Sequence, residues 1–466
     1  MARPVVIIAA LSMLLVVAAC GGSSASTPPV EQTPATDTPA ASVSASPPAA
    51  PTSSDSLPPL TPFGPDLATQ LHAIRDKVSE IRGLPVGSIA QEGVATAADL
   101  HQYNVDQFAE LEPDDTDTAN ASLTAMHYLG LAPEDYTLAN FAGDFSDDIA
   151  GFYDFRHKAL VLVGDPNKQL SKLDQLVLAH EYTHSLQDKT FDLEALEKQW
   201  ADNPLDKSGR SSYGETVKCL IEGDATFTEI KYAEEMFGPD WRTAIQDASA
   251  SPAAESALPP FIQHAVQFDY NDCEVFVSNL YDEGGWAAVN AAFRKPPATT
   301  EQIINIRKYS AGEFANSHMP ADLTKSDLSG WTKHDIGQFG MYDIYNYIVT
   351  LTDDPLSAYT AADGWGSGWL RTYDQGSDPG IAQAYLSFDS EADLTDFLAA
   401  FSKIKSYNAD VSDLAPGDAT EFAIGERFAS ISVATDAPAI ELLVAPSKAL
   451  LTKASPHLVA TPTPAP

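Results

Sequence analysis

The chain has 466 residues, of which 44% are hydrophobic, and it carries 65 acidic against 27 basic side chains, for a formal net charge of −38. Because the acidic residues are spread along the chain and no basic footprint is present, this composition argues against a nucleic-acid-binding protein. Strong negative charge instead suits an exported protein that must stay soluble, and the length allows two domains or one large domain.

The N-terminus has the features of a bacterial lipoprotein signal. Arg3 gives a short positive start, Val5 to Val17 form an apolar core, and Val17-Ala18-Ala19-Cys20 resembles a lipobox. We therefore expect residues 1–20 to act as a signal whose cleavage leaves Cys20 as a lipid-modified N-terminus. The apolar stretch is shorter than the roughly 20 residues of a membrane span, and a plain secretory signal is the alternative.

Two segments that flank the rest of the chain have a composition that cannot bury a core. Residues 21–60 consist mainly of Ser, Thr, Pro and Ala, and residues 455–466 have the same character. Both are predicted to be disordered, the first as a tether and the second as a tail. The protein is thus expected outside the cytoplasm, anchored to the cell membrane by its lipid.

The first part of the predicted folded chain is mostly helical. Residues 65–145 show apolar side chains at helical spacing. They are followed by two candidate strands, at residues 152–154 and 159–163, which are separated by a polar turn. This segment is predicted to form a strand–turn–strand unit.

The most informative stretch is His180-Glu181-Tyr182-Thr183-His184, an HExxH pattern. On a helix, two imidazoles four residues apart share one face, so they can bind one metal ion with Glu181 beside them. Ser171, with an acid three residues later, predicts the start of that helix. Both histidines fall on its apolar stripe, which favours a zinc site over ordinary core or surface histidines.

A catalytic zinc site needs a third protein ligand, and the best candidate is Glu222. It lies in a proline-free stretch, residues 215–235, among apolar neighbours where an unpaired carboxylate would be costly. Asp224 is the rival ligand, and Cys219 is a weaker one because thiolates favour closed structural sites. A solvated acid is the alternative interpretation of Glu222.

The same stretch predicts close packing and permits a disulfide. Gly223 costs helix stability, and close packing against the HExxH helix would explain it. With Cys20 taken by lipid, Cys219 and Cys273 remain, and an oxidising compartment permits a disulfide between them.

The fold class predicted from these patterns is α+β. A helix-dominated domain with a small sheet edge is expected over residues 61–324, and an α+β region over residues 325–454. The expected elements after the second ligand helix are helices at 275–281, 286–293 and 342–349, further elements at 381–388 and 394–401, and strands at 429–433 and 439–444.

The combination of His180–His184 with Glu222-Gly223-Asp224-Ala225 resembles the gluzincin zinc metallopeptidases, and more closely a group of prokaryotic envelope proteins of metallopeptidase type. The likeness covers roughly residues 75–400 and includes Ile81–Pro85, Ala150–Asp154, Leu186–Asp188, Phe191–Leu193, Gly284–Trp286, Pro296–Pro297, Thr300–Gln302 and Phe388–Asp393. It implies a zincin-like fold, a zinc ion, a peptide or protein substrate, and a strand before the zinc helix that pairs with extended substrate. The chain departs from these relatives at Asn305-Ile306, where they tend to carry His-Pro.

The predicted mechanism is hydrolysis of a peptide bond by a water that zinc activates. Glu181 is the expected general base, which passes the proton of the water to the leaving amine. The oxyanion that forms needs one more hydrogen-bond donor. Tyr270 is the first candidate, with Tyr309 and His264 behind it, although aromatic residues of this kind are more often core.

Two acids are expected to orient the metal ligands without binding the metal themselves. Asp188, one turn after His184, could orient that histidine, and a solvated helix-end acid is an equal alternative. Asp224 has the same supporting role if it is not itself a ligand.

Two other classes of function remain open. Glu181–His184 is also a Glu-x-x-His pair of the di-iron type, but such sites need a second pair and no other histidine follows a glutamate at this spacing. A tethered binding or scaffold protein that keeps the metal site without turnover is the second alternative, and the intact HExxH argues against it. An endopeptidase is expected, while the substrate and the oligomeric state are left open.

Overall fold

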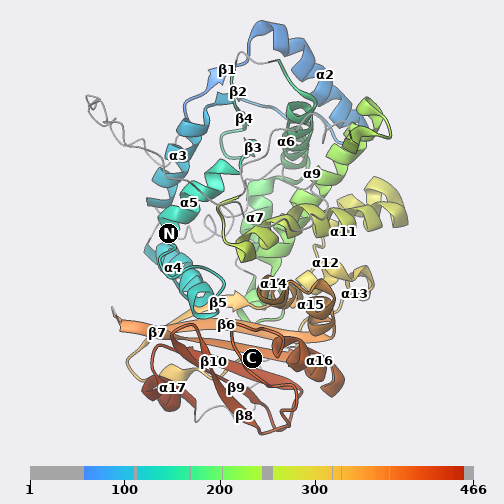
Figure 1. The fold of residues 1–466 in the computed structure, drawn as a ribbon. Helices are drawn as coiled ribbons and strands as arrows, with labels where there is room; N and C mark the ends of the chain where they lie inside the picture. Colours follow the sequence, from blue (N-terminus) through green and yellow to red (C-terminus); the bar gives the residue numbers. More distant parts are fainter. Residues whose placement is uncertain are drawn as a thin grey trace, which may run out of the picture.

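The computed structural model describes residues 57–455, except 110–112, 167–168, 202, 244–255, 317–318, 327 and 377. Figure 1 shows a mainly helical N-terminal part that holds a small sheet, and a C-terminal part built on a larger sheet. The predicted α+β class, with helices dominating the first part, is therefore confirmed.

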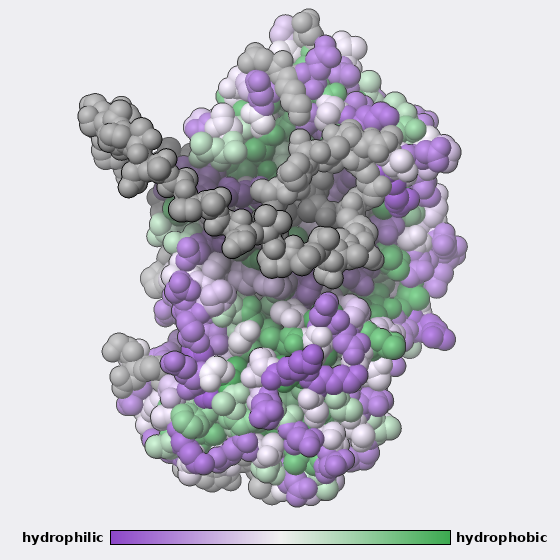
Figure 2. All heavy atoms as spheres, viewed as in Figure 1, coloured by the Kyte–Doolittle hydropathy of each residue, from purple (hydrophilic) through white to green (hydrophobic). Residues whose placement is uncertain are grey.

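Several predicted features of the chain ends fall outside this range. The signal at residues 1–20, the lipidation site Cys20, nearly all of the tether and the tail beyond Ser455 are not among the described residues. Within the described residues, no helix combines the length and the apolar composition that crossing a membrane requires. Hydrophilic residues are spread over both parts of the face shown in Figure 2, in keeping with charge distributed along the chain.

The N-terminal part is built around four helices that share one hydrophobic core: α2, α6, α9 and α11. Its elements in chain order are β1 (Thr61–Pro62), α2 (Pro65–Arg82), β2 (Gln91–Ala95), α3 (Ala97–Ala109), α4 (Pro113–Tyr128), α5 (Leu138–Asp147), β3 (Gly151–Asp154), β4 (Ala159–Val163), α6 (Lys172–Phe191), α7 (Leu193–Ala201), α8 (Pro204–Lys207), α9 (Tyr213–Phe237), α11 (Pro260–Ala292), α12 (Thr300–Ile304) and α13 (Ile306–Ala311).

The small sheet has the strand order β1-β2-β4-β3, in which β2 and β4 are parallel and the other pairs antiparallel. The hairpin β3–β4 confirms the predicted strand–turn–strand unit, with Gly151 opposite Leu162 in its register. β3 is thus an edge strand, and it packs against α6. A Cβ on Gly151 would lie 2.7 Å from Val177 Cγ1, so the glycine permits this close approach.

Helix α6 begins where the sequence predicts, because Ser171 and Asp174 form a capping box. The Ser171 side chain accepts a hydrogen bond from the backbone N–H of Asp174 at 3.1 Å, and the Asp174 carboxylate accepts one from the backbone N–H of Ser171 at 2.7 Å. The helix is buried without interruption from Leu176 to Asp188, since α2, α9 and β3 pack around it. The whole HExxH stretch therefore lies inside the protein.

Helices α9 and α11 are held together by close packing and by the Cys219–Cys273 disulfide. A Cβ on Gly223 would lie 2.3 Å from the backbone oxygen of Cys273. The expectation that Gly223 packs against the HExxH helix was therefore wrong. Successive helix residues point about 100° apart, so Glu222 can face α6 while Gly223 faces α11.

Helix α11 is one long element with a sharp bend. The sequence predicts separate helices at 275–281 and 286–293, and the structure joins them into a helix that already starts at Pro260. Gly284 and Gly285 have non-helical backbone angles, and Gly285 lies in the left-handed region with φ of 62°. The bend thus falls between the two predicted segments.

The C-terminal part is a six-stranded antiparallel sheet in the order β5-β6-β7-β10-β9-β8. Its elements are the 3-10 turn η1 (Leu323–Lys325), β5 (Thr332–Gln338), α14 (Met341–Thr352), α15 (Pro355–Ala362), β6 (Trp365–Gln375), β7 (Asp378–Phe388), α16 (Glu391–Phe401), β8 (Ala419–Ile424), β9 (Arg427–Val433), β10 (Ala439–Ala445) and α17 (Lys448–Ala454). Helices α14, α15 and α16 share one core with one face of the sheet, and η1 and α17 share a second core with the other. The predicted helix at 342–349 and the strands at 429–433 and 439–444 are confirmed.

Candidate metal centre

Two helices bring together the three predicted ligands. His180 and His184 lie on α6 and Glu222 lies on α9, and one ligand atom from each lies within 4.8 Å of the others. Glu222 Oε2 is 3.1 Å from His180 Nε2 and 3.5 Å from His184 Nε2. We refer to these three residues as the His–His–Glu group.

The His–His–Glu group has the donor set and spacing of a metal site. Zinc bonds of roughly 2.0–2.2 Å at tetrahedral angles place neighbouring ligand atoms about 3.3–3.6 Å apart. The two measured separations, 3.1 and 3.5 Å, lie close to or within that range. All three residues are buried, with 8% exposure or less, where charged groups need partners or a metal ion. The group therefore fits a single metal ion.

The two rival ligands are engaged elsewhere. Cys219 is bonded to Cys273 and has no free thiolate to offer. Asp224 is fully buried, and its carboxylate accepts hydrogen bonds from Arg82 at 2.6 Å and from Gln187 at 2.9 Å. Of the three acidic or thiol candidates, only Glu222 lies with the two histidines.

Without a metal ion, the carboxylate of Glu222 and the two imidazoles stabilise one another's charged forms. Burial opposes a charged ring at His180, but the nearby carboxylates of Glu222 and Glu229 outweigh it and raise the pKa of His180 to about 10. Burial likewise opposes charge on His184, whereas the Glu222 carboxylate raises the pKa of that ring. Burial raises the pKa of Glu222, but the two imidazoles outweigh it and hold this pKa well below its usual range.

These raised pKa values predict that a metal ion entering the His–His–Glu group would compete with protons across the neutral range. A protonated imidazole cannot bind a metal, so a ring with a pKa above its ordinary value of about 6.5 keeps excluding zinc at higher pH. We expect the zinc affinity of the protein to keep increasing from pH 6.5 to pH 8.5, as measured against a competing chelator at fixed ionic strength. An affinity that levelled off above pH 7 would contradict the assigned charge states.

Glu181 lies beside the ligands and next to the edge strand. It is 3% exposed, and the backbone N–H of Tyr153 in β3 donates a hydrogen bond to its carboxylate. Burial raises the pKa of Glu181, although the two neighbouring imidazoles act in the opposite direction. A carboxyl group with a raised pKa beside a metal position can both accept and return a proton.

The side chains next to the Nδ1 atoms of His184 and His180 are Gln187 and Glu229, and the sequence assigns a role to neither of them. Gln187 Oε1 lies 2.9 Å from His184 Nδ1, and Glu229 Oε2 lies 3.3 Å from His180 Nδ1. Asp188, the predicted partner of His184, instead accepts hydrogen bonds from the Tyr153 hydroxyl at 2.9 Å and from Lys158 at 2.6 Å. Gln187 comes three residues after His184, and side chains three apart on a helix are neighbours. This spacing is the signal that could have identified Gln187 from the sequence.

Of the three candidate oxyanion donors, Tyr270 has a ring contact with one of the candidate metal ligands, His180. Its ring centroid is 5.8 Å from that of His180. His264 Nδ1 is engaged with Asn346 and Thr350 on α14, at 3.2 and 3.0 Å. The Tyr309 hydroxyl donates to the backbone oxygen of Lys295 at 2.8 Å.

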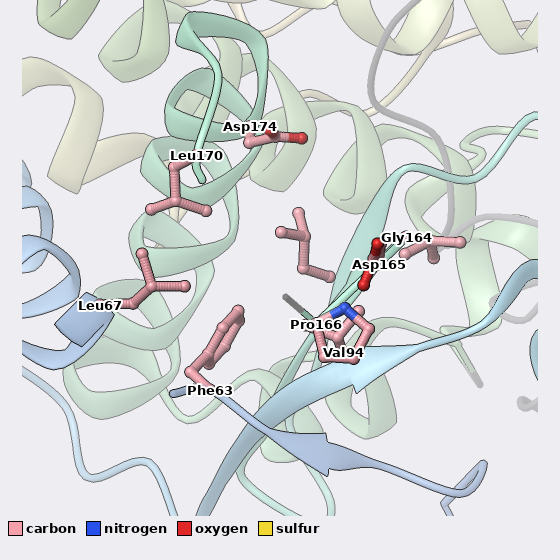
Figure 3. A pocket seen from close by; sticks show the side chains of 10 residues that line it. Phe63, Leu67, Val94, Gly164, Asp165, Pro166, Leu170 and Asp174 are labelled. Carbon is pink, nitrogen blue, oxygen red and sulfur yellow. The ribbon is translucent and has the colours of Figure 1, made fainter. Parts of the chain in front are cut away.

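A small pocket lies beside the N-terminal end of α6 and not at the His–His–Glu group. Figure 3 shows Phe63, Leu67 and Leu170 lining it, with Asp165 and Asp174 at its polar side. None of the three metal ligands lines this pocket. It is therefore not the metal position itself.

Two of the family-like segments away from the ligands meet in a structural contact. Lys308 lies 2.6 Å from Glu301 and 3.3 Å from Asp389, so it joins the Thr300–Gln302 segment to the Phe388–Asp393 segment. Asn305, where the resemblance would lead one to expect histidine, accepts a hydrogen bond from the Arg307 backbone N–H and caps α13. Lys308 and Asn305 thus make contacts that stabilise the fold away from the His–His–Glu group.

Comparisons of the chain with protein-family models, with curated proteins and with solved structures found no match. The function is therefore inferred from the geometry and chemistry of the His–His–Glu group and its neighbours.

The Cys219–Cys273 disulfide is expected to contribute measurably to the free energy of unfolding. Its cysteines are 54 positions apart, and closing a loop of that length stabilises a fold by about 4 kcal/mol in the chain-entropy model. We expect the double substitution Cys219→Ser/Cys273→Ser to lower the free energy of unfolding by roughly 2–4 kcal/mol in urea titrations of the metal-free protein. Wild type in reductant is the control, and an unchanged urea midpoint in both would show that the bridge contributes nothing.

Proposed function

We propose that this protein is a zinc-dependent peptidase that acts outside the cytoplasm and is held to the membrane by a lipid on Cys20. The observation that carries the proposal is the buried His–His–Glu group with the carboxylate of Glu181 beside it. Two imidazoles, one carboxylate and an open fourth position are the ligand set of hydrolytic zinc sites. The resemblance to gluzincins supports the same activity.

In the proposed mechanism, metal binding, proton transfer and oxyanion stabilisation are carried out by different residues. A zinc ion held by the His–His–Glu group would polarise the peptide carbonyl and make water a nucleophile at neutral pH. Glu181 accepts the proton of the attacking water and delivers it to the leaving amine, for which its buried, raised-pKa carboxyl group is suited. Tyr270, beside His180, is the proposed donor to the oxyanion.

The edge of β3 that pairs with no other strand of its sheet is the proposed position for an extended substrate, although Gly151, Phe152 and Tyr153 are themselves buried. β3 pairs on one side with β4 and is the last strand of its sheet, directly beside α6. An extended peptide can add to such an edge through main-chain hydrogen bonds, which suit peptides of varied sequence. A peptide or protein substrate is therefore proposed.

The proposed location rests on two features. Disulfides persist in oxidising compartments and are rare in the cytoplasm, and this chain has one between α9 and α11. The Val17-Ala18-Ala19-Cys20 sequence has the pattern of a lipid attachment site. In cells, the variant Cys20→Ala tests this anchor, because the protein should then leave the membrane fraction.

The direct test of the proposal combines metal analysis with a cleavage profile. We expect about one zinc ion per chain, as a single three-ligand site requires, and loss of that zinc in the double variant His180→Ala/His184→Ala. The same preparations are then incubated with a mixed peptide library, with and without a chelator. Stoichiometric zinc in the double variant would contradict the site, and zinc without any cleavage would favour a non-catalytic binding or scaffold protein.

A further inference from the structure

A line of buried polar side chains runs from His184 away from the metal position. Gln187 Oε1 lies 2.9 Å from His184 Nδ1, and Gln187 Nε2 donates to Asp224 Oδ2 at 2.9 Å. Asp224 Oδ1 accepts a hydrogen bond from Arg82 Nε at 2.6 Å. Arg82, Asp224 and Gln187 are all fully buried. We call these three residues, which come from α2, α9 and α6, the Arg82 relay.

The hydrogen-bond direction in the Arg82 relay is fixed by the acceptors around Gln187. Its amide nitrogen lies 2.9 Å from the backbone oxygen of Ile221 and 2.9 Å from the Asp224 carboxylate, and both groups can only accept. A flipped amide would set its oxygen against both of them. The amide oxygen must therefore face His184, so the proton between them is on Nδ1. The lone pair of the neutral ring is then on Nε2, which faces Glu222.

The far end of the Arg82 relay is anchored to the bend in α11. A second nitrogen of the Arg82 guanidinium donates to Asn290 Oδ1 at 2.7 Å, and the guanidinium carbon lies 4.4 Å from the centre of the Trp286 ring. Trp286 directly follows the two non-helical glycines. Four segments of the family likeness thus meet here: Ile81–Pro85, Leu186–Asp188, Glu222–Ala225 and Gly284–Trp286.

We propose that the Arg82 relay is a positioning device that holds His184 in the form protonated on Nδ1, with Nε2 directed at the metal. A buried Asp224 carboxyl group that lost its arginine would tend to take up a proton, and it would then no longer be restricted to accepting a hydrogen bond from Gln187. The inference rests on the metal site of the proposed function and is independent of peptide cleavage. It differs from the arrangement at His180, whose Nδ1 faces the Glu229 carboxylate directly.

The test measures zinc affinity with a competing chelator in three variants. Gln187→Met keeps the length of the side chain but removes the acceptor, and loss of such an outer partner typically costs 10–100-fold in metal affinity. Gln187→Glu in its protonated form keeps both the acceptor for His184 and a donor for Asp224, so we expect it to recover much of that loss. Leu186→Ala is the control, because it removes core packing from the same turn of α6, and a leucine side chain has no hydrogen bond to either imidazole to lose.

A metal-free measurement separates this inference from the proposed function. In isotope-labelled, metal-free protein, the hydrogen bond to Gln187 is expected to give the Nδ1 proton of His184 a slowly exchanging NMR signal, whether the ring is neutral or charged, and Gln187→Met is expected to make that exchange fast. If wild type bound no zinc, the proposed function would fail while this signal still tested the Arg82 relay. The inference is overturned if Gln187→Met binds zinc within twofold of wild type, if Leu186→Ala loses as much affinity, or if the Nδ1 proton is absent in wild type.

Discussion

Replacing Glu181 with glutamine is expected to reduce peptide cleavage by roughly 10²–10⁴-fold while the protein keeps its zinc. Glutamine has nearly the size of glutamate and can still accept the hydrogen bond from the Tyr153 backbone N–H, so the fold around it should persist. It cannot accept a proton from water, however, and that is the step assigned to Glu181. The measurement is the initial rate of peptide cleavage beside the zinc content of the same sample.

Glu222→Gln is the matched control for this prediction, because it makes the same chemical change at a ligand. A charged ligand is removed, so the zinc affinity itself should fall, and activity should return in part when excess zinc is added. The role assignments would be wrong if Glu181→Gln lost its metal while Glu222→Gln kept both metal and rate.

Arg82→Met is expected to lower the free energy of unfolding by about 3–5 kcal/mol, the cost of leaving one member of a buried ion pair without its partner. Both Arg82 and Asp224 have side chains with 0% exposure, so solvent cannot replace the lost guanidinium. Methionine has a similar length and fills most of the space. The measurement is urea unfolding of the metal-free protein, which excludes any contribution from bound zinc.

The control for Arg82→Met is an ion pair on the surface of the same protein. Lys198 and Glu194 lie 2.9 Å apart on α7, with side chains that are 72% and 49% exposed. Such pairs contribute about 0–1 kcal/mol, so Lys198→Met should change stability little. If Arg82→Met cost no more than Lys198→Met, the buried pair would not be a main stabilising contact of the four-helix core.

The parts of the site that could be predicted from sequence are those encoded at short range. The capping box at Ser171 marks the start of α6, and the four-residue spacing places His180 and His184 on one face. Glu222 could be nominated because a lone acid among apolar neighbours implies a partner. The sequence preferred Glu222 over Asp224, and the structure added the contacts that distinguish these two buried acids of α9.

Long-range contacts are what the sequence could not supply. Arg82 lies 142 positions from Asp224, and no local pattern links the two. Gly223 was assigned to the wrong neighbour because helix periodicity indicates which side of α9 it occupies but not which helix covers that side. The strand order of the C-terminal sheet, in which β10 lies between β7 and β9, likewise follows from pairing across the chain.

The division of the metal ligands between two helices also sets an order of events in the life of the protein. His180 and His184 come from α6 and Glu222 comes from α9, so the three-ligand position exists only after these helices have packed. If the protein is an exported zinc enzyme, as proposed, a chain exported unfolded would cross the membrane without zinc and would acquire the ion where it folds. The amount of active protein would then depend on the zinc available outside the cytoplasm and not on the supply inside the cell.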